Sequence, residues 1–169
     1  SRGLCGAFNT NIIKVATSLA ENTYSEQLAA GNLSFVFLGK KGYDILKKRF
    51  PQCALNTDYL DLFSNLSYDR ISAVSQMIMD NFKVDGFDKV EVCYSKFKNA
   101  AIQEPIAVQY LPVIKDTTNK LADAKKTKAD YIFEPDKEQL LNELIPSILH
   151  TTFQKFVLDT HASEHGARM

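Results

Sequence analysis

Apolar residues recur at regular spacing along the N-terminal part of the chain. Between residues 12 and 28 they return every three to four positions, which predicts an amphipathic helix, and Gly31 suits its end. Residues 33–38 form a short apolar run rich in β-forming residues. Because this run does not alternate with polar residues, we expect a strand covered on both faces, as in a parallel sheet. Residues 42–50 predict a short helix that Pro51 ends.

The middle of the chain predicts a helix followed by a hairpin. Ser67 is a favourable N-cap for a helix with one apolar stripe, which is expected to end at Asp85-Gly86. Apolar and polar residues then alternate over 90–94, which predicts a strand. Residues 102–113 predict its antiparallel partner, and the two prolines in that stretch favour a place at the sheet edge.

Three further segments complete the pattern. Residues 52–66 are ambiguous: we expect a loop, with a short edge strand near Cys53–Leu55 as an alternative. Residues 115–130 are polar and lysine-rich, which indicates an exposed loop, and a short extended stretch follows at 131–134. Residues 136–169 predict a long helix, which would reach roughly 50 Å and exceed what so small a domain covers. Its expected apolar stripe is Leu141, Leu144, Ile145, Ile148, Leu149, Phe153 and Phe156.

The order of these elements predicts an α/β fold. We expect a globular α/β domain over residues 1–135 and a long helix leaving it over 136–169. A glycine-containing turn that runs into a helix usually follows a strand, so the chain is expected to begin just after its own first strand. We therefore expect an unfilled or borrowed strand position in the sheet, beside residues 33–38 or 90–94.

Composition excludes several classes of protein. Apolar residues make up 45% and charged residues 24%, which is the ordinary globular range, and 20 basic residues balance 20 acidic ones. The absence of a basic excess argues against a nucleic-acid partner. Apolar runs fall short of the roughly 20 residues that span a bilayer, so we expect a soluble chain without direct membrane insertion. Cys5, Cys53 and Cys93 are far apart and predict buried, unreactive thiols in a reducing compartment.

Two motifs carry candidate chemistry. The Gly-rich segment Arg2–Ala7 lacks the Gly-Lys-Ser/Thr of a phosphate-binding loop and the third glycine of a dinucleotide site, which favours a structural turn. His161, Glu164 and His165 match the inverted zinc-protease pattern H-x-x-E-H. Because a catalytic zinc needs a third protein ligand, solvated or partner-facing side chains are the favoured interpretation. We therefore predict no catalytic, cofactor-binding or metal-binding residues, and no cofactor.

Four segments, in order along the chain, resemble the gamma-subunit family of F-type ATP synthases, the central rotor stalk. They are Arg2–Asn11 (R-G-L-C-G-x-x-N), Phe97–Ala100, Tyr131–Pro135 (Y-x-x-E-P) and Ala162–Met169 (S-E-x-x-A-R-M). The resemblance implies a Rossmann-like sheet with helices on both faces, an antiparallel hairpin and a long C-terminal helix leaving the domain. It also implies a middle fragment, the foot of the stalk, without both terminal coiled-coil helices.

The function implied by this resemblance is mechanical and non-catalytic. Such a subunit couples proton-driven rotation of a membrane ring to ATP synthesis or hydrolysis in a catalytic α/β hexamer. Implied partners are the epsilon subunit, the ring and, through the missing helices, the hexamer. Implied contact residues are Tyr131, Phe133 and Glu134, with edge-strand packing as the alternative for the two aromatics.

The cysteine spacing lacks the close pair of redox-regulated chloroplast members, which favours a bacterial source and a place on the cytoplasmic face of the inner membrane. The alternative function is a nucleotide-binding α/β enzyme domain.

Overall fold

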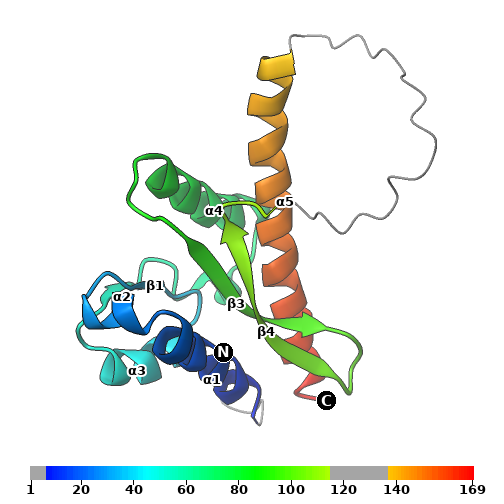
Figure 1. Ribbon diagram of the computed structural model, residues 1–169. Helices are drawn as coiled ribbons and strands as arrows, with labels where there is room; N and C mark the ends of the chain where they lie inside the picture. Colours follow the sequence, from blue (N-terminus) through cyan, green and yellow to red (C-terminus); the bar gives the residue numbers. More distant parts are fainter. Residues whose placement is uncertain (1–6, 115–136) are drawn as a thin grey trace, which may run out of the picture.

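The computed structural model describes residues 7–114 and 137–169 (Figure 1). In chain order, its elements are α1 (Phe8–Ser18), a π-helical turn (Leu19–Thr23), α2 (Ser25–Ala29), β1 (Ser34–Val36), α3 (Lys40–Arg49), β2 (Ala54–Asn56), a 3-10 turn (Leu62–Ser64), α4 (Tyr68–Lys83), β3 (Val90–Phe97), β4 (Gln103–Leu111) and α5 (Lys137–Gly166). The predicted α/β class is confirmed, and within the loop expected over residues 52–66 the alternative, a short strand near Cys53–Leu55, is present as β2.

The described strands form two separate pairs. β1 pairs with β2 in parallel, with Phe35 opposite Leu55, as the uninterrupted apolar run predicts. β3 pairs with β4 in an antiparallel hairpin, with Tyr94 opposite Ile106. Within residues 7–114 and 137–169, no strand joins β1 to β3. The unfilled strand position expected from the sequence stays a prediction.

Local sequence signals set the ends of α4. The Ser67 hydroxyl accepts a hydrogen bond from the backbone N–H of Arg70 at 3.3 Å, which confirms the predicted N-cap. At the other end, Asp85 has φ of +55°, a left-handed conformation that ends the helix.

The helix predicted over residues 12–28 is interrupted. A π-helical turn and a break at Tyr24 divide it into α1 and α2. The Tyr24 hydroxyl donates to the Glu91 carboxylate on β3 at 2.7 Å, and Lys89 contacts the same carboxylate at 3.1 Å. A tertiary contact with the hairpin therefore accompanies the break, which local periodicity does not reveal.

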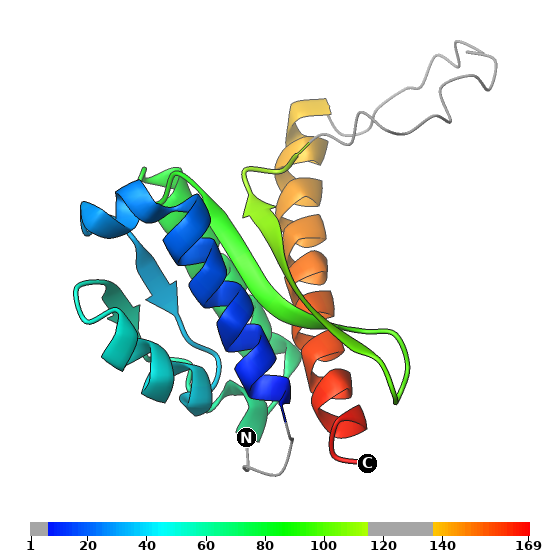
Figure 2. The ribbon, with the colours of Figure 1, turned by 60° about the horizontal axis from the view of Figure 1, so that its bottom comes forward.

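Helices cover both faces of the hairpin. Figure 2 shows α1 on one side of β3 and β4, and α5 on the other. Between α4, the hairpin and α5 lies the larger apolar core of the described residues, with Ile71, Val74 and Phe153 among its members. A smaller core lies around β1 and α3, where Phe37 and Phe50 are buried.

The long helix α5 divides into two halves. In its C-terminal half, Leu149, Phe153, Phe156 and Val157 are buried in the larger core. Its N-terminal turns rise beyond the rest of the fold (Figure 1). The predicted stripe is therefore continuous in sequence and buried only from Leu149 onward.

Candidate functional site

The contact residues implied by resemblance, Tyr131, Phe133 and Glu134, lie outside the described residues, as do Arg2–Gly6 of the N-terminal turn. The candidate surface in the described part of the chain is the exposed half of α5. We define the α5 stripe as Leu141, Leu144, Ile145 and Ile148, which are 44–60% exposed. Four large apolar side chains on one side of a helix favour a partner surface over open solvent.

A buried hydrogen-bond network holds the base of the α5 stripe. The Tyr110 hydroxyl of β4 donates to the Leu149 carbonyl at 3.1 Å and lies 2.9 Å from the Ser75 hydroxyl of α4. Directly after β4, Val113 and Ile114 are both 63% exposed, so further apolar surface lies at the end of this strand.

The sequence predicts the four residues of the α5 stripe as part of one apolar stripe that continues to Phe156, without showing where along the helix the stripe is covered. The signal that the α5 stripe is exposed was the predicted length of the helix, which exceeds what a domain of this size covers.

His161 and His165, the two histidines of the H-x-x-E-H pattern, lie close together, but the described residues supply no third metal ligand beside them. The rings of His161 and His165 lie 4.6 Å apart on successive turns of α5. Burial and the neighbouring His165 lower the pKa of His161. Glu164 of the same motif forms an ion pair with Arg168. Within the described ranges, no three metal-ligating side chains gather in one place, so the pattern does not extend to a zinc site there.

The two described cysteines have the properties of protonated thiols. Burial, with a smaller contribution from the Glu91 charge, raises the pKa of the Cys93 thiol to about 11. Burial also raises the pKa of Cys53, which lies in the smaller core. Both are free, and both are poor nucleophiles at neutral pH because the thiolate is the reactive form.

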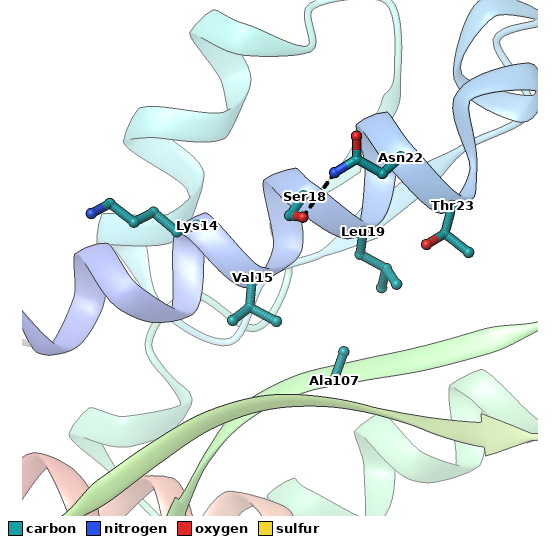
Figure 3. Close-up of a pocket in the computed structure, with 7 residues that line it drawn as sticks. All are labelled: Lys14, Val15, Ser18, Leu19, Asn22, Thr23 and Ala107. Atoms are coloured by element: carbon teal, nitrogen blue, oxygen red, sulfur yellow. Dashed lines mark hydrogen bonds between the residues drawn. The ribbon is translucent and has the colours of Figure 1, made fainter.

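Two hollows on the described surface offer little for small-molecule chemistry. Figure 3 shows the first, about 390 Å3, between α1 and β4, where Val15 and Leu19 face Ala107. Asn22 there donates to Ser18 on its own helix. The second, about 440 Å3, adjoins the start of α3.

Charges balance in the second hollow. Its lining carries Lys40 and Lys41 against Asp44 and Asp61, and Asp61 also accepts from Arg70 at 2.7 Å. Two lysines offset by two carboxylates do not create the positive potential that recognises phosphate groups.

Comparison with protein families assigns the chain to a class. The family model described as ATP synthase matches residues 1–169. The chain belongs to this family.

Within the family, its relatives are gamma chains. The chain is 44% identical over 168 residues to the ATP synthase gamma chain of Cytophaga hutchinsonii, covering 99% of this chain and 56% of the relative. It is 40% identical over 170 residues to the gamma chain of Flavobacterium psychrophilum, covering 100% of this chain and 55% of the relative. The resemblance to gamma subunits is confirmed, and the chain spans just over half the length of these relatives.

Solved structures support the fold. The central stalk and c-ring structure of the Tetrahymena thermophila mitochondrial ATP synthase contains a chain that matches with a TM-score of 0.66 and 23% identity, covering 99% of this chain and 69% of that one. The rotor of the Euglena gracilis mitochondrial enzyme matches with a TM-score of 0.60 and 19% identity, covering 99% of this chain and 60% of that one. At these identities the comparison confirms the fold class alone.

Proposed function

We propose that this chain is the foot of a non-catalytic rotor subunit in the central stalk of an ATP synthase. The observation that carries the proposal is the family match along the whole chain, together with its gamma-chain relatives. The foot grips a membrane ring driven by protons, and its rotation is transmitted to a catalytic hexamer that makes or hydrolyses ATP. Residues 1–135 form the foot domain, and residues 136–169 begin the long helix of the shaft.

The partners at the foot are the epsilon subunit and the membrane ring. Tyr131, Phe133 and Glu134 contact them, and the α5 stripe, which follows a few residues later in the chain, adds the apolar part of the interface. The role of the α5 stripe in this interface is supported by the 60% exposure of Ile148 and the 45% exposure of Leu144. Interface cores are depleted in charge and more apolar than the rest of the protein surface.

In this proposal, the ATP synthase that contains the chain lies on the cytoplasmic face of a bacterial inner membrane. Among the described helices, none combines the length and the hydropathy needed to span a bilayer. Attachment through the ring and the epsilon subunit would hold the foot there.

A binding experiment tests the interface on α5. Leu144→Lys in the full-length subunit is expected to weaken binding of purified epsilon subunit at least tenfold, because a buried charge without a partner is costly. Glu143→Lys is the control. It places the same side chain on the same exposed half of α5, on the other side of the helix from Leu141 and Ile148. Equal binding by both variants would argue against the α5 stripe as the contact.

A coupling experiment tests the residues before α5. Glu134→Lys in the full-length subunit is expected to lower ATP yield per proton translocated while the fold stays intact. Normal assembly with unchanged coupling would contradict a role for Glu134.

The nucleotide-binding alternative predicts a different result. A domain that binds nucleotide gains about 2.7 kcal/mol of stability at a hundredfold excess of ligand over its dissociation constant. For a rotor foot we expect no thermal shift with ATP, ADP or NAD. A clear shift with any of them would favour the alternative.

A further inference from the structure

The contact between α5 and β3 includes one residue, Ser95, whose backbone N–H and C=O both bond to hydroxyls of the helix. In the hairpin register, Ser95 lies opposite Pro105. The Ser163 hydroxyl of α5 donates to the Ser95 carbonyl at 3.2 Å. The Ser95 N–H donates to the Thr160 hydroxyl at 3.4 Å. The helix thus supplies both bonds to the backbone of one strand residue, which is itself 1% exposed.

The same side of α5 approaches the tip of the hairpin one turn later. Thr160, Ser163 and Gly166 recur at intervals of three residues, so they lie along one side of the helix. A Cβ atom at Gly166 would lie 3.1 Å from the Gln103 amide nitrogen and 3.3 Å from the Ala100 carbonyl oxygen. A side chain at residue 166 would therefore be in tight contact, and the neighbouring hairpin atoms would have to move by a few tenths of an ångström.

The other contacts between α5 and the hairpin are not directional. The Phe156 ring lies 4.6 Å from that of Tyr94, and the Phe153 ring lies 5.6 Å from that of Tyr110. Such apolar packing contributes most of the stabilisation but tolerates small displacements along or around the helix. Hydrogen bonds to the backbone of a single residue depend on distance and angle, so they define one position.

We propose that Thr160, Ser163 and Gly166 form a registry seam that fixes α5, axially and in rotation, against the β3–β4 hairpin. Resting on the proposed rotor function, the seam lets torque pass between the foot and the shaft helix without slip. Thr160 and Ser163 are positioning residues: they touch no substrate and act through the hairpin. Loss of the two hydroxyls should let α5 shift against the hairpin when torque is applied, and should have a smaller effect on the stability of the fold.

The test uses the full-length subunit in an assembled ATP synthase in membrane vesicles. Protons pumped per ATP hydrolysed are measured against a rising opposing proton gradient. The variant is Thr160→Val with Ser163→Ala, which removes both hydroxyls and introduces no larger side chain. We expect this ratio to fall about threefold or more at high opposing gradient, because neither hydroxyl then holds the Ser95 backbone in place.

Matched variants separate registry from general damage. Thr152→Val also removes a hydroxyl from α5, but the Thr152 hydroxyl bonds to the Ile148 carbonyl within the helix. The number of protons pumped per ATP hydrolysed should therefore equal that of the parent. Thr160→Ser keeps the hydroxyl and should also match the parent. If the double variant fails to assemble, Thr160→Val alone serves, because Val and Thr have nearly the same shape.

Hydrogen exchange gives a readout that does not depend on rotation. The Ser95 amide should exchange at least threefold faster in Thr160→Val than in Thr152→Val, because it loses its acceptor. Equal exchange in the two variants, or a double variant that pumps as well as Thr152→Val, would overturn the registry seam while leaving the rotor function intact. A parental subunit that assembles but never couples hydrolysis to pumping would overturn the rotor function and the seam together.

Discussion

The two halves of α5 share one sequence pattern and lie in different environments. From Leu141 to Phe156, apolar residues recur along a single stripe. Leu149 is 8% exposed in the larger core, whereas Ile145, about one turn earlier on the same side of the helix, is 48% exposed. Periodicity identifies which side of a helix is apolar, but only the surrounding elements decide whether that side is covered.

This difference separates stability from function along one helix. The C-terminal half contributes to folding of the described domain, because its apolar side chains leave water on folding. The α5 stripe gains nothing comparable until a partner covers it. Substitutions in the two halves should therefore affect different measurements.

The largest expected effect is Phe153→Ala. It removes a ring from the centre of the larger core and should lower the free energy of unfolding by about 3–5 kcal/mol, measured by urea denaturation. Ile148→Ala, in the exposed half, should lower it by no more than about 0.5 kcal/mol. Similar losses for both variants would show that the two halves are equally covered.

Tyr110→Phe tests the network at the junction of the halves. The change removes the hydroxyl that bridges Ser75 and the Leu149 carbonyl, and Ser75 is fully buried. We expect a loss of about 1–3 kcal/mol in unfolding free energy, because a buried hydroxyl loses its partner. Tyr68→Phe is the control, since Tyr68 is 56% exposed. A loss no greater than that of the control would mean that the network does not anchor α5.

His161, in the C-terminal half of α5, should make the free energy of unfolding depend on pH. Burial, then the charge of His165, holds the pKa of His161 below its usual 6.5. The unfolded chain therefore binds more protons, so stability should be complete above about pH 6.5 and decline as pH falls from there through the folded-state pKa. His161→Gln should flatten the decline in unfolding free energy between pH 7.5 and 5.

His165→Gln sharpens this test. Removing the second ring removes one cause of the lowered pKa of His161 and should reduce the decline without abolishing it. A decline unchanged by His161→Gln would assign the pH dependence to other groups.

The smallest expected effect on stability is Leu144→Gln. Leu144 is 45% exposed in the protruding half, so unfolding free energy should change by no more than about 0.5 kcal/mol. A loss above about 2 kcal/mol would indicate that this half is covered within the fold itself.

Much of the fold could be predicted from local signals. The Ser67 cap, the stripe of α4, the alternation of β3 and the uninterrupted run around β1 all agree with the environment that each residue meets. The break at Tyr24 could not be predicted, because it accompanies a bond to Glu91, 67 residues away in sequence. The proposed partner surface was only partly predictable: Tyr131, Phe133 and Glu134 rest on resemblance, and the sequence indicates a helix too long for the domain to cover without showing which part of its stripe is exposed.

By itself, the sequence determined the class of fold, the order of its elements and, through its motifs, the family. These depend on periodicity, caps and residue identity, which are local properties of the chain. The tertiary structure alone decided where α5 changes from buried to exposed, and that Ser163 and Thr160 meet the backbone of Ser95. Both depend on how elements far apart in sequence are placed, because burial and hydrogen bonding at these positions belong to pairs of elements rather than to either one.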